Sequence, residues 1–177
     1  MKRNIILLIV ACINSILLKA EGTNNLSYIP DGSYIGCVID DTDAIYENIY
    51  GEKLTLNDFY MLCPHRSPVA NEVAVENFVE TINEGTNRIT ATHDWFRSNW
   101  NYHVKPEYIF VIKINKMGNF KANVFSGFYY NVTLIIMNNE KVISNIVFQN
   151  LDGDFNDVYT HRDVAKAVAK KVLKILK

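Results

Sequence analysis

The feature that most constrains this 177-residue chain is a one-sided apolar stripe in its last eighteen residues. The stripe residues recur at helical spacing, and they are Val164, Val168, Val172, Ile175 and Leu176. Thr160 and Asp163 have the spacing of a capping box, which predicts where the helix begins. A helix with one apolar face must bury that face against another layer. The chain is therefore expected to end in a helix that covers a sheet.

The lysines of this segment allow two interpretations. They lie off the apolar stripe and crowd toward the end of the helix, where positive charge complements the helix dipole. This arrangement favours the interpretation that the lysines form the solvent-exposed face of the helix. A helix that binds a membrane or a polyanion is the alternative.

The segment before this helix has the alternation of strands. Residues 108–114 are β-branched and aromatic, residues 120–137 predict one long strand or two, and residues 142–148 predict another. Asn138-Asn139-Glu140-Lys141 predicts a hairpin turn between the last two. Connections this short require antiparallel pairing.

Upstream, residues 33–39 predict a mostly buried strand. A helix is expected to begin near Pro68 and end at Gly85, and shorter helices are expected over residues 54–62 and about 90–99. The fold class is therefore expected to be α+β. A single, mainly antiparallel sheet of about four or five strands is packed by two or three helices, including the amphipathic C-terminal one.

The chain opens with two basic residues, runs apolar from Ile5 to Leu18, and turns polar after Ala20. These are the parts of a secretory signal, whereas a membrane-spanning helix needs about 20 apolar residues. Residues 1–20 are therefore expected to be a signal peptide and residues 21–177 a single α+β domain. The protein is expected to be exported, and to be periplasmic or secreted.

Ile9-Val10-Ala11-Cys12 offers an alternative ending to the signal, because it resembles a bacterial lipobox. Cleavage there would leave a lipoprotein anchored through Cys12. The apolar run continues beyond Cys12, so cleavage after Ala20 fits better. Contact with a membrane is expected only if Cys12 is lipidated.

Without residues 1–20, the chain keeps 15 of its 18 basic residues and all 19 acidic ones, a net charge of −4. An acidic body argues against nucleic-acid binding, which needs a clustered basic footprint. Cys37 and Cys63 also remain. In an oxidising compartment they can pair as a disulfide, and otherwise each is a small buried hydrophobe.

Asp41 and Asp43 follow the first strand in an Asp-x-Asp pattern, which resembles the metal-dependent phosphatases of the haloacid dehalogenase type. That resemblance implies Asp41 as nucleophile and Asp43 as general acid. The residue two positions after Asp43 is Ile45, where that family has Thr or Val. A solvated acidic turn is the preferred interpretation.

Asp152, Asp154 and Asn156 occupy alternating positions like the first ligands of a calcium loop. The loop needs glycine at its sixth position, which here is Asp157, and it needs an entering helix where a strand is expected. No metal site is therefore predicted, and the four histidines show no ligand spacing. No cofactor is expected either, because nucleotide-binding and nucleophile motifs are missing from the sequence.

Exposed aromatic residues would indicate a protein-binding surface, because tyrosine and tryptophan are enriched at interaction hot spots. The candidates are Trp95, Trp100, Tyr102 and Tyr129. A protein partner is therefore expected, and the chain is expected not to be an enzyme.

Residues 92–177 resemble the domain shared by the N-terminal region of the Tol translocation protein, the curli secretion channel family and the activators of penicillin-binding proteins. The matching residues are Trp95, Glu107–Val111, Tyr130–Ile136 and Arg162–Val168. The resemblance implies a non-enzymatic accessory protein of the cell envelope that works through protein contacts. A small metal-dependent hydrolase and a secreted, host-directed binding factor are the alternatives.

Overall fold

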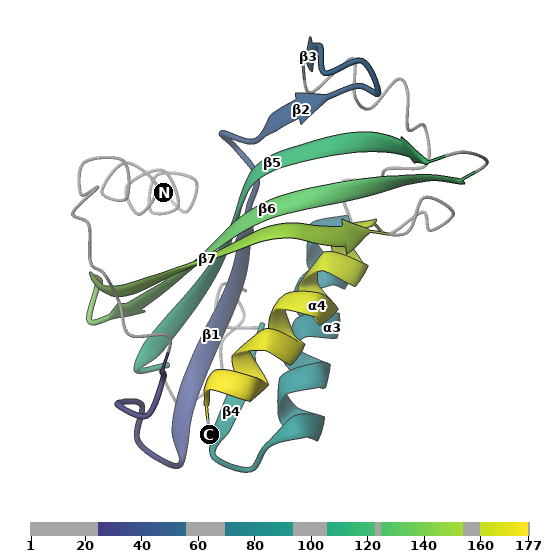
Figure 1. The fold of residues 1–177 in the computed structure, drawn as a ribbon. Helices are drawn as coiled ribbons and strands as arrows, with labels where there is room; N and C mark the ends of the chain where they lie inside the picture. The colour runs from purple at the N-terminus through teal and green to yellow at the C-terminus, as the bar shows by residue number, and fades with distance from the viewer. Residues whose placement is uncertain (1–24, 56–69, 94–105, 123–124, 154–159, 177) are drawn as a thin grey trace.

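The computed structural model describes residues 25–55, 70–93, 106–122, 125–153 and 160–176 (Figure 1). The elements, in chain order, are β1 (Ser33–Asp40), β2 (Ile45–Glu47), β3 (Lys53–Leu54), α3 (Ala70–Gly85), β4 (Ile89–Thr92), β5 (Tyr108–Ala122), β6 (Phe125–Asn138), β7 (Lys141–Gly153) and α4 (Thr160–Ile175). The expected α+β class, the helix ending at Gly85 and the C-terminal helix are confirmed.

The sheet is mixed and has seven strands in the described part of the chain, so the expectation of a mainly antiparallel sheet of four or five strands is wrong. The long strand β5 lies at its centre. Its first half pairs in parallel with β1 and its second half in parallel with β2. On its other side, β6 and then β7 follow in antiparallel order.

The parallel pairing of β1 with β4 requires a crossover, and α3 lies in the connection that runs from β1 through β2 and β3 to β4. A helical crossover returns the chain in its original direction, so β4 pairs in parallel with β1. Residues 90–92 were expected to open a helix, but they belong to β4, where Ile89 and Ala91 alternate into the core; residues 94–99 of that expected helix lie outside the described residues. Leu54 was expected to begin another helix and lies instead in β3, while residues 56–62 lie outside the described residues.

Strand β5 is longer than the sequence predicted, because residues 116–118 continue it instead of ending it. The strand absorbs one irregularity between Ile114 and Lys116 and then resumes pairing on both sides. The hairpin turn that follows β6 is confirmed. Asn139 and Glu140 both have positive φ, 46° and 66°, as a two-residue turn matched to the twist of the strands requires.

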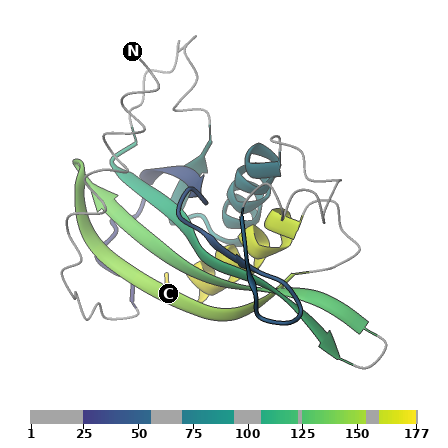
Figure 2. The same cartoon turned by 90° about the horizontal axis from the view of Figure 1, so that it is seen from above.

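Both helices pack on one face of the sheet (Figures 1 and 2). The apolar stripe of α4 is buried there, as the sequence predicted, and α3 adds Phe78. The Phe78 and Phe110 rings meet edge to face, with their centroids 6.5 Å apart. This contact joins α3 to the first half of β5.

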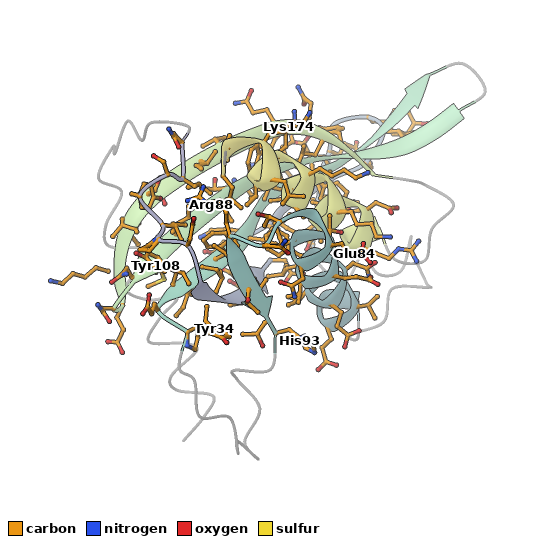
Figure 3. All side chains as sticks on the ribbon, turned by 90° about the horizontal axis from the view of Figure 1, so that it is seen from below. Tyr34, Glu84, Arg88, His93, Tyr108 and Lys174 are labelled. Carbon is orange, nitrogen blue, oxygen red and sulfur yellow. The ribbon has the colours of Figure 1, made fainter. Side chains whose placement is uncertain are left out.

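The chain before β1 is tied to the turn between α3 and β4. The Arg88 guanidinium donates to Asp31 at 2.6 Å and to the Ile29 carbonyl at 2.9 Å (Figure 3 labels Arg88). The backbone N–H of Leu26 donates to the carbonyl of Ile175 at the end of α4. These bonds hold Leu26 and Ile29 in the core, where both are fully buried.

The face of the sheet that turns away from α3 and α4, which we call the second face, has a smaller apolar cluster. Its buried members are Val111, Ile135 and Met137, and partly buried neighbours extend it. Outside this cluster, the face combines polar side chains with exposed apolar ones, such as Val147. It therefore differs in chemistry from the helix-covered face.

Candidate interaction surface

Three neighbouring strands place a polar cluster on the second face. Glu47 of β2 is in register with Gly118 of β5, which is in register with Tyr129 of β6. One oxygen of the Glu47 carboxylate accepts from the Lys116 ammonium at 2.7 Å and from the Tyr129 hydroxyl at 3.2 Å. The Lys116 nitrogen also lies 5.7 Å from the centre of the Tyr129 ring, within the range of a cation–π contact.

Gly118 makes this arrangement possible. A Cβ atom at position 118 would overlap the Tyr129 ring. Because glycine has no side chain, the ring lies across β5 and its hydroxyl reaches Glu47 on the far side of that strand. Tyr129, one of the aromatic residues proposed from the sequence, is therefore a half-buried, anchored side chain.

The contacts within the cluster shift the pKa values of Glu47 and Lys116 so that both groups stay charged. The hydrogen bond from Lys116 lowers the pKa of Glu47, and the same bond raises the pKa of Lys116. Both groups therefore stay ionised through the neutral range, so neither is suited to exchange a proton with a substrate there. The arrangement suits a fixed pattern of charge and aromatic surface.

The turn that follows β2 is closed by two backbone hydrogen bonds, from the N–H of Asn48 to the carbonyl of Glu52 and from the N–H of Gly51 to the carbonyl of Asn48, and it is ordered further by the Asn48 side chain. The amide oxygen of Asn48 accepts from the backbone N–H groups of Tyr50 and Glu52, at 2.9 and 3.0 Å. Its amide nitrogen donates to the Glu52 carboxylate at 2.7 Å. Gly51 supplies the positive φ, 78°, that the turn needs.

The β2–β3 hairpin presents three exposed apolar side chains, which we call the hairpin tip: Ile45 at the start of β2, and Ile49 and Tyr50 in the turn. The Tyr50 side chain is 81% exposed. Sequence reasoning did not find this site, because residues 44–66 show no clear periodicity. The available signal was Asn48 followed three residues later by Gly51, a combination typical of tight turns.

The acidic turn between β1 and β2 is held by internal contacts. The Asp43 carboxylate pairs with the Lys113 ammonium at 3.0 Å. Asp40 is buried and accepts from the backbone and the hydroxyl of Thr42, at 3.1 and 2.6 Å. Asp41, the implied nucleophile, is half-buried beside them. Lys113 therefore neutralises the group that the phosphatase resemblance would use as general acid.

In the described ranges, no three His, Cys, Asp or Glu side chains gather as a metal site would require. The backbone of Asp152, the first residue of the calcium-loop pattern that the sequence argued against, belongs to β7. Asp154 and Asn156 lie outside the described residues, as do Trp95, Trp100 and Tyr102.

Cys37 lies in β1 and is 1% exposed. Burial raises the pKa of its thiol well above the ordinary value, which makes the thiolate scarce and the group unreactive. Cys63 lies outside the described residues, so the disulfide between them stays a prediction.

No known family model matches the chain, and no curated protein matches it in sequence. Among solved structures, it is similar to the PelC dodecamer of Paraburkholderia phytofirmans, with 17% identity and a TM-score of 0.44 over 82% of this chain and 89% of that one. It is also similar to the hypothetical protein CT253 of Chlamydia trachomatis, with 8% identity and a TM-score of 0.45 over 81% and 97%. Similarity at this level assigns no function.

Neither of the two helices in the described part of the chain has the length and apolar character needed to cross a bilayer.

Proposed function

We propose that this chain is an exported, non-enzymatic accessory protein of the cell envelope or the secreted fraction, and that it works by binding another protein. The observation that carries this proposal is the hairpin tip, where Asn48 holds Tyr50 almost fully exposed on an ordered turn.

A large apolar side chain on the surface costs solubility and calls for a reason when its neighbours are apolar too. Tyrosine is a preferred anchor in protein interfaces, because it offers a large contact area at a small loss of conformational freedom. The bonds to Asn48 fix the backbone beneath Tyr50 before any partner arrives. The entropic cost of binding is therefore smaller, because the turn is already ordered.

The polar cluster supports the same proposal, because it adjoins the hairpin tip. Glu47 is the last residue of β2, and Asn48 opens the turn. An anchored tyrosine, a carboxylate and an ammonium therefore flank the exposed apolar side chains. A surface of this composition, apolar at one part and polar beside it, is typical of interfaces that form between separately folded proteins.

The proposal that the protein is exported rests on its first twenty residues. Their basic start, apolar run and small residue at position 20 support export. The resemblance of residues 92–177 to the Tol, curli and penicillin-binding-protein-activator domains supports an accessory role in the envelope.

The proposal is tested by site-specific photo-crosslinking in the producing cells. A crosslinking amino acid at position 50 is expected to give one discrete protein adduct. Tyr34 is the matched control, since it is an exposed tyrosine at the other end of the sheet (Figure 3). Adducts that are equally weak and diffuse from both positions would contradict the proposal.

The alternative hydrolase is tested separately with Asp41→Asn. If the purified protein hydrolyses a generic phosphoester with an added divalent metal and this variant does not, the non-enzymatic proposal fails. A secreted, host-directed binding factor would use the same surface. It is recognised when the position-50 adduct forms only with proteins of a second organism.

A further inference from the structure

The two helices carry opposite charges on the side that faces away from the sheet. The exposed side of α3 has an acidic ridge at four-residue spacing: Glu72, Glu76, Glu80 and Glu84. The outer side of α4 has a basic ridge at the same spacing: Lys166, Lys170 and Lys174. Residues four apart lie on one side of a helix, so each ridge is continuous. The outer surface of the helix layer is therefore negative along one helix and positive along the other.

The ridges lie side by side and run in the same direction. The helices α3 and α4 are neighbours on one face of the sheet (Figures 1 and 2). A Cβ atom at Gly85 would overlap the Leu173 side chain, so the C-terminal ends of the two helices meet. Glu84 is therefore level with the part of α4 between Lys170 and Lys174 (Figure 3 labels Glu84 and Lys174).

The two ridges do not neutralise each other. Among the residues that the structure describes, no ion pair joins a glutamate of α3 to a lysine of α4, and the contact of the acidic ridge is the 3.8 Å approach of Glu76 to His93. Glu84 also lies in the last turn of α3, which has no basic residue. A carboxylate is unfavourable there, because the C-terminal end of a helix is negative. A cation from outside this pair of helices would remove that cost.

We propose that two copies of this chain associate through their helix layers, about a two-fold axis that runs parallel to α3 and α4. Rotation about that axis places the acidic ridge of each copy on the basic ridge of the other, at the same level along the axis. Glu84 of one copy then faces Lys170 and Lys174 of the second. An axis across the helices would instead place like ridges together, so the charges select the arrangement.

A second copy is the favoured occupant because both signs of charge are present on one surface. A membrane or a polyanion attracted to the lysines would be repelled by the glutamates beside them. The same surface of a second copy matches both ridges at once. The proposal goes beyond the proposed function, since neither ridge includes the hairpin tip. Because the paired charges are exposed, the dimer is expected to be weak and sensitive to salt.

Sedimentation equilibrium of the protein, as the expressing cells process it, is the first test, in a concentration series reaching about 1 mM. A monomer–dimer equilibrium is expected at an ionic strength of about 0.01 M. Salt at about 1 M should raise the dissociation constant by about tenfold or more, because the Debye length falls from about 30 Å to about 3 Å. A monomer throughout the low-salt series overturns the proposal, and so does a dimer whose dissociation constant does not change with salt.

Charge reversal tests the arrangement. Glu80→Lys with Glu84→Lys makes one variant, and Lys170→Glu with Lys174→Glu makes a second. Each variant alone faces like charges across the axis, so its dissociation constant should rise by about tenfold or more at low salt. In an equimolar mixture, the changed helix of one variant faces the changed helix of the other, and the unchanged helices also match. Sedimentation of the mixture is therefore expected to show a heterodimer as strong as the wild-type dimer.

Lys53→Glu with Lys141→Glu is the matched control for the second variant. Both lysines are exposed on hairpins of the sheet, and the change in net charge is the same, so the dimer should persist. A control that dissociates as readily as the second variant overturns the proposal. So does a mixture that stays monomeric while the wild type dimerises.

Thermal unfolding of each variant verifies that loss of the dimer is not loss of the fold. A wild-type protein that stays monomeric and sediments with vesicles of anionic lipid, while the second variant does not, would show that the lysines of α4 bind a membrane, and the dimer proposal would fail.

Discussion

The two faces of the sheet are built for different purposes. The helix-covered face is sealed by aliphatic and aromatic side chains, and its central contact joins Phe78 to Phe110. The second face combines a small apolar cluster with paired charges, an anchored tyrosine and an adjoining ordered turn. The helix-covered face is held together by apolar packing, which is not directional. The second face depends on hydrogen bonds, which fix the positions of the groups that they join.

This difference separates stability from recognition. Burial of apolar area scales with the size of the contact and tolerates small rearrangements. Directed bonds contribute less to stability, yet they set the positions of individual groups. Substitutions on the helix-covered face should therefore change the free energy of unfolding, and substitutions on the second face and its hairpin should mainly change binding.

The largest effect is expected from Phe78→Ala. The side chain is fully buried, so its removal leaves a cavity between α3 and β5 and should lower the free energy of unfolding by about 3–5 kcal/mol. Urea denaturation measures this loss. Val79→Ala is the control on the same helix, since Val79 is only partly buried and should cost clearly less. Equal losses would show that the buried contact of Phe78 with Phe110 contributes no more than a partly buried side chain of the same helix.

The helix-covered face was also the part that the sequence predicted best. The spacing of Val164, Val168 and Val172 identifies both the helix and the side that it buries, because burial repeats with the helical period. The first strand, residues 33–39, was found because its side chains are apolar over a long enough run. A helix that buries one face needs an apolar residue about once per turn, so this burial can be seen in the sequence.

The second face and the parallel pairings left no such pattern. The strand at Ile89–Thr92 is four residues long, too short to show alternation, and a neighbouring helix signal obscured it. Lys116 and Gly118 resemble the end of a strand, since a charge and a glycine commonly end one. Their roles depend on Glu47 and Tyr129, which lie far away in the sequence and meet them only in the folded chain.

A middle-sized effect is expected from Glu47→Gln, which removes the charge and keeps the shape. Glu47 pairs with Lys116 near the surface, so the variant should lose about 1 kcal/mol at neutral pH. Because the pKa of Glu47 is lowered in the folded state, its contribution is present above the ordinary value of 4.5 and is lost as the pH falls through the lowered value.

The difference in stability between wild type and Glu47→Gln should therefore vanish in acid. Chemical denaturation at a series of pH values measures it. Glu80→Gln on the exposed side of α3 is the control and should show no pH-dependent difference. A difference that persists unchanged well below pH 4 would mean that the charge of Glu47 is not what matters.

The smallest effect on stability, and the most informative one, is expected from Asn48→Ala. The variant loses the acceptor for two exposed backbone N–H groups, which water can replace, so the loss should be about 1 kcal/mol or less. The turn beneath Tyr50 would then be held before binding by its two backbone bonds alone. The adduct from position 50 should therefore weaken more than the small loss of stability explains, because the partner must complete the ordering of the turn.

Thr55→Ala is the control for this comparison, since Thr55 is exposed just beyond β3 and accepts neither of those two bonds. If Asn48→Ala leaves the adduct at full strength, the order of the turn contributes nothing to binding, and the hairpin tip acts through exposure alone. If the adduct weakens while the unfolding curve hardly moves, recognition and stability reside on different faces of the same sheet. The two measurements together separate these outcomes, because a general loosening of the fold would lower both.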